Sequence, residues 1–405
     1  MTSRRGARIL LLGGDTDHNV GDRAILAATA RCLATHDALA EITAVGEPGM
    51  SDAIPGIARW IRRGPRGMAA LARTAFDADR ILVAGGGLFQ DDDSRAKMPY
   101  WAARIALLRL LNSRIVGHSI GAGPLDHVES RVAARIACAA LSRISVRDRY
   151  ARETLVACTA RPIDVVPDPA FMLEPSPRPL AIDFLRSVDL PPQRPIVVAA
   201  VRRWYHARGG FVPNAVKVKA GFGLKCDERR FECLLDTIAD ALLRSARRLD
   251  AGVLLLPGYN VGHEADDLAC GALARRLDGV TVRLAWLTDP RLYKAVVGQA
   301  SLVVASRMHP LIFAAGMGVP LVGLSYNPKF DGLFELLELP ARPLALDDFP
   351  DRWAAPELAA AMEAALAAGT DLRRRAESLA ASVRQRTLAA AFGDTGVPGT
   401  EPADA

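Results

Sequence analysis

The sequence RILLLGGDTDHNVGD, residues 8–22, passes from a short apolar run through a glycine turn to the start of a helical pattern. Such a run is typical of a first buried strand in a parallel sheet, and the helix after it offers free amides at its positive end. The turn lacks the spacing GxGxxG, so a dinucleotide fingerprint is not indicated. Asn19 and Asp22 are candidate ligand-binding residues in this turn, and they are equally good candidates for capping the helix.

The same alternation of short strands and longer helices continues along the chain and indicates βαβ units. Two proline-rich segments, 174–179 and 191–195, interrupt this alternation and are typical of a linker. We therefore predict an α/β protein with two Rossmann-like domains that face each other across a cleft, each with a parallel sheet, in a GT-B-like arrangement. The expected units are a first domain at 1–175, a second at 176–354, a helical region at 355–392 and a disordered tail at 393–405. Strands are expected at 8–12, 42–45, 80–84, 114–119, 144–146 and 164–166, and then at 196–201, 252–256, 280–284, 302–305 and 321–324.

Composition limits the function classes. The chain has 405 residues, a formal net charge of +6 and six scattered cysteines without a CxxC pair, which favours reduced structural thiols over a metal or disulfide framework. A positive balance suits anionic ligands, and no nucleic-acid module is recognisable. No apolar run reaches the roughly 20 residues of a membrane span, and the start does not resemble a signal peptide, so we expect a soluble, cytoplasmic protein. The basic, amphipathic stretch 57–73 is expected to be a solvated helix beside a Gly-Pro turn, with contact to the inner membrane surface as the alternative.

Several loops should meet at the carboxyl edges of the two sheets, where open α/β proteins bind ligands. In the first domain, Gly86 and Gly87 would leave bare backbone facing the cleft, and Asp91 could accept a proton from a hydroxyl group. Ser119 could line the same cleft, although a tight turn explains it equally well. Three successive aspartates, residues 91–93, are more often a solvated loop than a Mg²⁺ site, so no metal is expected.

The second domain has the stronger signal. Its strand at 302–305 is followed by Arg307 and His309 at a helix start, which brings together a guanidinium, an imidazole and free amides. Arg202 follows another strand at the same edge and is a further candidate for anion binding. Ser325 and Lys329 belong to the next loop, with Lys329 as a possible second cation. This pattern predicts a site for a phosphate or carboxylate next to a group that can supply a proton near neutral pH.

Taken together, the motifs resemble the polysaccharide pyruvyl transferase family, and they span about residues 9–334. The matching segments are NVGD at 19–22, GGGLFQD at 85–91, IGAGP at 120–124, SVRD at 145–148, DPAF at 168–171 and the run from 306 to 329. The resemblance implies a GT-B-like transferase that moves the pyruvyl group of phosphoenolpyruvate onto sugar hydroxyls as a ketal, in exopolysaccharide or cell-surface glycan biosynthesis. It also implies that the first domain binds the acceptor and the second domain binds phosphoenolpyruvate.

For individual residues the resemblance implies that Arg307 and Arg202 hold phosphoenolpyruvate, that His309 is the general acid and that Asp91 is the acceptor base. The Arg-Met-His element replaces the commoner Arg-Leu-His, a conservative apolar exchange. Phosphoenolpyruvate would be a co-substrate, and no cofactor is implied. The acceptor sugar could be free, nucleotide-bound or part of a lipid-linked oligosaccharide. Two alternatives remain: a GT-B glycosyltransferase that uses a nucleotide sugar, and a non-catalytic binding protein of the cell envelope.

Overall fold

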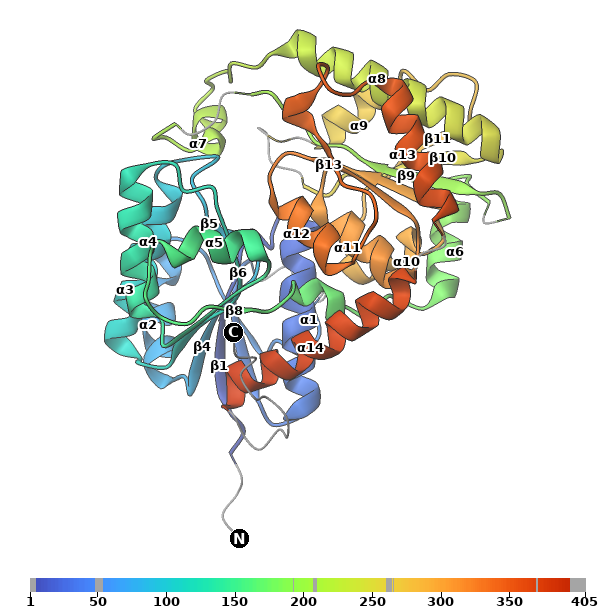
Figure 1. Cartoon of the computed structure of the whole chain (residues 1–405). Coiled ribbons are helices and arrows are strands. Elements are labelled where there is room, and N and C mark those ends of the chain that lie inside the picture. Colours follow the sequence, from blue (N-terminus) through green and yellow to red (C-terminus); the bar gives the residue numbers. More distant parts are fainter. Residues whose placement is uncertain are drawn as a thin grey trace.

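A computed structural model describes residues 5–47, 54–191, 193–206, 210–259, 264, 266–368 and 371–393. Two parallel sheets, each covered by helices, form two domains that pack against each other. Helix α1 (Val20–His36) lies between the two sheets, at the contact of the domains (Figure 1). The predicted fold class, an α/β protein with two parallel sheets, is confirmed. All six cysteines are free thiols.

The first sheet has the strand order β3-β2-β1-β4-β6-β7-β8, with β5 paired to β6. Its central strands are almost fully buried because helices cover both faces, whereas the edge strands are short and partly exposed. The strands are β1 (Arg8–Leu12), β2 (Glu41–Val45), β3 (Arg59–Ile61), β4 (Arg80–Ala84), β5 (Gly87–Phe89), β6 (Ile115–Ala122), β7 (Arg143–Val146) and β8 (Asp164–Val165). The helices after α1 are α2 (Met68–Asp77), α3 (Lys97–Leu111), α4 (Val128–Ala140) and α5 (Arg149–Val156), and the turns η2 (Pro65–Gly67) and η3 (Pro169–Met172) are 3₁₀.

The second sheet has the order β11-β10-β9-β12-β13-β14. Its strands are β9 (Ile196–Ala200), β10 (Gly252–Leu255), β11 (Val282–Leu284), β12 (Leu302–Ala305), β13 (Leu321–Ser325) and β14 (Leu344–Ala345). Its helices are α6 (Arg178–Ser187), α7 (Asn214–Lys219), α8 (Glu228–Leu249), α9 (Asp266–Ala274), α10 (Pro290–Val297), α11 (Met308–Met317) and α12 (Lys329–Leu336).

In both sheets the strand order reverses beside the first strand of the series, between β1 and β4 and between β9 and β12. Such a switch point opens a crevice at the carboxyl ends of the strands, where doubly wound proteins bind ligands. The loops after β1, β4, β9 and β12 therefore occupy the positions from which a shared site can be built.

The last two helices pack against different parts of the molecule. Helix α13 (Ala355–Ala367) packs on α8 and β13 of the second sheet's layer, whereas α14 (Leu372–Phe392) packs on α1, η3 and β4 of the first domain and on α11 of the second. In Figure 1, α14 runs obliquely beneath both halves. Within the region 355–392, α13 therefore belongs to the second domain, and α14 packs against both domains.

Most predicted strands are confirmed, and several local predictions need correction. The stretch 57–73 is not one helix: it contains strand β3, a 3₁₀ turn and only the start of α2. The 3₁₀ turn begins at Pro65, after Gly64 with φ of 82°, and this Gly-Pro pair ends the strand. Strands β5 and β14 were not expected because each is too short to show a period. The predicted disordered tail lies outside the described residues except for Gly393.

Within the described residues, no helix is both long and apolar enough to cross a membrane.

Candidate functional site

A cavity of about 570 Å³ lies where the two switch points face each other. The loops after β1, β4, β9 and β12 all contribute to its wall, together with the first turns of α1, α3 and α11. Eight of the predicted site residues line this cavity: Asn19, Asp22, Gly86, Gly87, Arg202, Arg307, His309 and Lys329.

The start of α1 forms one wall. The Asn19 side chain caps the helix by accepting hydrogen bonds from the amides of Gly21 (2.8 Å) and Asp22 (3.3 Å). The Asp22 carboxylate accepts from the Asp15 amide at 2.8 Å, and burial raises its pKa. Gly86, with φ of 72°, brings its backbone so close to Asp22 that a side chain at this position would collide with the carboxylate.

His309 lies against this wall from the opposite domain. A Cβ atom added at Gly21 would collide with Nδ1 of the imidazole, so the first turns of α1 and α11 are in direct contact. The Nε2 atom is 3.7 Å from Oδ2 of Asp168, and neither atom has a hydrogen-bond partner among the described residues. Burial lowers the pKa of His309 to about 3, although Asp22 opposes the shift. Without a bound anion the imidazole is therefore neutral at physiological pH.

Two arginines from the second domain share buried carboxylates. Arg307 forms a forked interaction with Asp266 (Nε to Oδ2, 2.9 Å) and contacts Glu264 at 2.6 Å. Arg202 binds the other oxygen of Glu264 at 2.7 Å. The remaining Nη1 atom of Arg307 makes no hydrogen bond to the described residues, and Nε of Arg202 is buried without one. The carboxylates hold both guanidinium groups in place while leaving N–H groups available to an anion.

Tyr326 stands among these cations. Its ring is stacked on the guanidinium of Arg202, 4.1 Å from ring centre to Cζ, and Lys329 donates a hydrogen bond to its hydroxyl. Burial opposes ionisation of this phenol, but the charges of Lys329, Arg202 and Arg307 outweigh it and lower the pKa of Tyr326 to about 7. This part of the cavity therefore favours negative charge.

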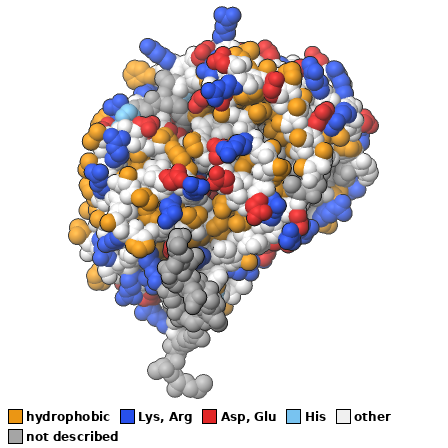
Figure 2. All heavy atoms as spheres, viewed as in Figure 1, with side chains coloured by type: hydrophobic (Ala, Val, Ile, Leu, Met, Phe, Trp, Pro, Cys, Tyr) orange, Lys and Arg blue, Asp and Glu red, His pale blue; other side chains and the backbone are white. Residues whose placement is uncertain are grey.

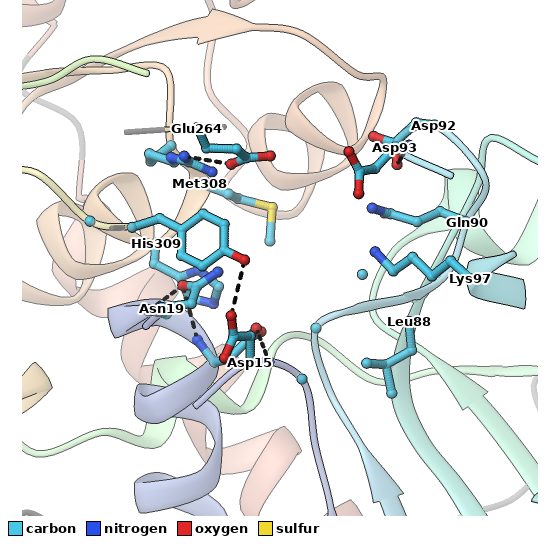
Figure 3. A pocket seen from close by; sticks show the side chains of 18 of the residues that line it. Asp15, Asn19, Leu88, Gln90, Asp92, Asp93, Lys97, Glu264, Met308 and His309 are labelled. Atoms are coloured by element: carbon cyan, nitrogen blue, oxygen red, sulfur yellow. Dashed lines mark hydrogen bonds and ion pairs between the residues drawn. The ribbon is translucent and has the colours of Figure 1, made fainter. Parts of the chain in front are cut away.

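The first domain provides a mixed wall opposite the arginines. Gln90, Asp92, Asp93 and Lys97 lie on one side of the cavity in Figure 3, and Glu264, Met308 and His309 lie on the other. The ammonium group of Lys97 makes no hydrogen bond or ion pair to the part of the chain that the structure describes, whereas its backbone amide donates to the Ser94 carbonyl at 3.1 Å. This wall therefore offers polar groups of both signs to a ligand in the cavity.

Three predicted site residues do not line this cavity. Asp91 is only 1% exposed, and its carboxylate accepts hydrogen bonds from the amides of Asp126 (3.2 Å) and His127 (3.0 Å). Ser119 occupies an irregular position of β6 with φ of 52° and donates to the Pro167 carbonyl at 3.0 Å. The Ser325 hydroxyl donates to the Asn327 carbonyl at 3.0 Å. All three side chains hold loops in place, and the structure does not place Asp91, Ser119 or Ser325 among the residues that line this cavity.

Other lining residues were not selected from the sequence. Arg147 reaches the cavity from the loop after β7 and lies 3.7 Å from Asp168, and Arg63 follows β3 and pairs with Asp17 at 3.2 Å. The segment SVRD at 145–148 was itself recognised, but an Arg-Asp pair is as often structural as functional. Arg147 could have been selected because it directly follows the end of a strand. Arg63 could not, because the stretch 57–73 was interpreted as a helix and the strand before Arg63 was not recognised.

No group of three or more His, Cys, Asp or Glu side chains within the described residues is arranged to hold a metal ion.

The fold is shared with sugar-active enzymes of low sequence identity. UDP-GlcNAc 2-epimerase from Methanocaldococcus jannaschii is 12% identical with a TM-score of 0.57, over 94% of this chain and 99% of that one. Anabaena Alr3699/HepE, solved with UDP and glucose, is also 12% identical with a TM-score of 0.57, over 94% and 98%. The E. coli ADP-heptose heptosyltransferase II is 14% identical with a TM-score of 0.50, over 89% and 98%. The fold is therefore of the GT-B type.

The family is more specific than the fold. Residues 19–328 match the model of the polysaccharide pyruvyl transferase family, and the chain belongs to that family. The matched range includes each of the loops that build the cavity except the start of the loop after β1 and the last of the lining residues, Lys329. No curated protein matches the chain in a sequence comparison.

Proposed function

We propose that the protein transfers the pyruvyl group of phosphoenolpyruvate to two hydroxyls of a sugar, forming a pyruvate ketal of an exopolysaccharide or cell-surface glycan. The observation that supports this most is the convergence of Arg202, Arg307 and Lys329 on one part of the cavity, next to His309. Phosphoenolpyruvate is a small ligand with a phosphate and a carboxylate, and forked guanidinium groups bind both. The uncapped first turn of α11 adds amides that favour the same anion.

In the proposed reaction, the protonated imidazole of His309 gives a proton to the methylene carbon of phosphoenolpyruvate, and the adjacent carbon becomes cationic. An acceptor hydroxyl attacks that carbon and loses its proton. The bond from this carbon to the phosphate oxygen then breaks, phosphate leaves, and a second hydroxyl closes the ketal with loss of its proton. Arg202 and Arg307 stabilise the negative charge on the phosphate as it departs.

The structure favours a different residue from Asp91 as the base that deprotonates the acceptor. Asp91 is bound to loop amides, whereas Asp92 and Asp93 line the cavity from the first domain. We therefore assign acceptor deprotonation to this pair of neighbouring carboxylates. The acceptor would lie between them and His309, on the side of the cavity that Figure 3 shows with Gln90 and Lys97.

The first experiment compares thermal unfolding of the protein with phosphoenolpyruvate and with UDP, GDP and CMP sugars. A ligand at about 100 times its Kd adds roughly 2.7 kcal/mol, so a rise with phosphoenolpyruvate alone supports the proposal. A rise with one nucleotide sugar and none with phosphoenolpyruvate would instead make the protein a glycosyltransferase.

Variants then assign the roles. Arg307→Lys keeps the charge that Asp266 and Glu264 need but loses the fork, so the shift caused by phosphoenolpyruvate should disappear. Arg276→Lys is the matched control, because Arg276 pairs with Glu232 and Asp236 outside the cavity. His309→Gln should still bind phosphoenolpyruvate and should lose turnover by about a hundredfold or more. Near-normal turnover of His309→Gln would remove this residue from the mechanism.

A further inference from the structure

Helix α3 has a second apolar face that no other element of the described residues covers. Its buried side, which includes Met98 and Ile105, packs on the first sheet's layer. On the opposite side Tyr100, Leu107 and Leu110 are 57%, 56% and 82% exposed. These positions, with the exposed Ala103 between them, follow the three- and four-residue spacing of one helix face. The exposed stripe is therefore continuous along the helix.

Helix α4 packs beside α3 and repeats this arrangement. Val128, Val132 and Ile136 are exposed at four-residue intervals, while Ala133 and Ala137 are buried beneath them. The neighbouring α2 adds Met68 and Phe76, both more than half exposed. About half of the large apolar side chains that are exposed in the described residues lie on these three helices, although the helices form only about a tenth of the chain. Concentration of this kind marks an interaction surface.

The charge around this surface is positive. Residues 57–143 contain fourteen Lys and Arg but only seven Asp and Glu, whereas the whole chain has a net charge of +6. The positive excess of the protein thus lies in the segment that includes α2, α3 and α4. Helix α3 has no acidic residue, and Arg109 and Arg135 lie next to the exposed apolar stripes. Figure 2 shows orange and blue side chains side by side along its left margin, over these helices.

We propose that the outer face of α2, α3 and α4, called the α3–α4 face below, binds an anionic lipid bilayer. Apolar side chains between arginines are the composition with which helices lie in the boundary of a membrane, where leucine enters the acyl region and arginine contacts lipid phosphates. A second copy of this chain is less suitable as the occupant, because a symmetric contact would place the arginines of both copies against one another.

The α3–α4 face lies close to the acceptor side of the cavity, because helix α3 belongs to both. The first turns of α3 reach the cavity, where Lys97, Trp101 and Arg104 line the wall together with Tyr100, the first residue of the exposed stripe. The same helix therefore connects the proposed bilayer surface with the acceptor side of the site. An acceptor held at the membrane would be presented to the cavity over the length of one helix, about 22 Å for fifteen residues.

The test is sedimentation of the full-length protein with vesicles of phosphatidylcholine, with and without about 30% phosphatidylglycerol, at low and high salt. Binding is expected only with the anionic vesicles and should weaken as salt rises. Leu107→Glu combined with Leu110→Glu should reduce binding by about tenfold or more. The matched control is Leu180→Glu with Leu268→Glu, since both leucines are more than half exposed on helices of the second domain.

Two checks separate the outcomes. Circular dichroism and the thermal shift with phosphoenolpyruvate should be the same in both double variants, because none of the four leucines lines the cavity. Equal loss of vesicle binding in both double variants, or no binding of the parent protein to anionic vesicles, would overturn the proposal. A dimer in sedimentation velocity that Leu107→Glu with Leu110→Glu dissolves would assign the face to a second copy instead.

Discussion

His309 lies at a buried contact between the two domains, with Gly21 on one side and Asp168 on another. Its ordinary pKa of 6.5 falls to about 3 because burial penalises the charged imidazole, and Arg147, Lys329 and Arg307 add to the shift. The same cations attract phosphoenolpyruvate, and a bound phosphate and carboxylate would offset their charge. A general acid at this position therefore acquires its proton as the donor binds.

The first residue-scale prediction follows from that coupling. At pH 6 to 7 free His309 is neutral, and a bound anion raises its pKa, so binding of phosphoenolpyruvate should take up as much as one proton. Affinity for the donor should consequently fall as pH rises through the raised pKa of the complex. Calorimetry in two buffers with different ionisation enthalpies measures the uptake. The His309→Gln variant should bind phosphoenolpyruvate without taking up a proton. Equal proton uptake by the variant and the parent protein would show that another group accepts the proton.

Residue identity alone could predict part of the site. Arg307 and His309 stand out because a cation and an imidazole follow a strand at a helix start, and both line the cavity. The sequence could not show which of the three successive aspartates faces the cavity. Only the path of the chain shows that Asp91 accepts hydrogen bonds from loop amides. Tyr326 could not be found in this way, because its lowered pKa depends on cations from three separate loops.

Among the elements, the contact between α1 and α11 sets the geometry of the site. The backbone of α1 can approach the imidazole only because residue 21 has no side chain. A backbone hydrogen bond beside it, from the Val20 amide to the Gly258 carbonyl (3.0 Å), belongs to an isolated antiparallel bridge of Asn19 with Tyr259 and joins the same two domains. The position of His309 is thus fixed by helix packing more than by its own hydrogen bonds.

Gly21→Ala is therefore expected to displace His309 and reduce turnover by about a hundredfold, with a loss of stability of about 1–3 kcal/mol from overpacking. Gly271→Ala is the matched control, because this helical glycine of α9 has no neighbour closer than 3.9 Å to an added Cβ. The control should keep its activity and gain up to about 1 kcal/mol. Kinetics and thermal unfolding of the two variants provide the comparison, and an active Gly21→Ala enzyme would contradict it.

Regular elements were predictable where burial gives a clear pattern. Strands β1, β4 and β12 have the predicted bounds, since each is a continuous apolar run ending in a glycine or polar turn. Strand β3 was missed because only three residues pair, and the arginines around it gave the stretch the look of a basic helix. The distribution of α13 and α14 over the two sides depends on long-range packing that no local pattern contains.

At the scale of the whole molecule, one hydrophobic core crosses between the domains. The same cluster of buried side chains includes Ile9 and Leu11 of the first sheet, Val198 and Val303 of the second sheet, and Val383 of α14. Polar contacts follow the same boundary: Lys294 of α10 donates to the Leu173 carbonyl at 2.6 Å. Neither domain can lose its structure without exposing apolar surface of the other.

Calorimetric unfolding should therefore show a single transition with a ratio of van't Hoff to calorimetric enthalpy near one, although chains of this size often unfold in steps. Lys294→Ala together with Tyr259→Phe, which removes the 3.0 Å bond from the Tyr259 hydroxyl to Asp15, should lower the midpoint without splitting the peak. Two resolved transitions in the parent protein would show that the shared core does not couple the domains.

The placement of α14 has a consequence for synthesis. His118 of β6 is buried and lies 2.9 Å from the Thr387 hydroxyl of α14, so a strand from the first third of the chain is covered by its final helix. Until α14 has been synthesised and has left the ribosome, the first sheet and α1 therefore expose to water the apolar surface that α14 covers in the folded protein.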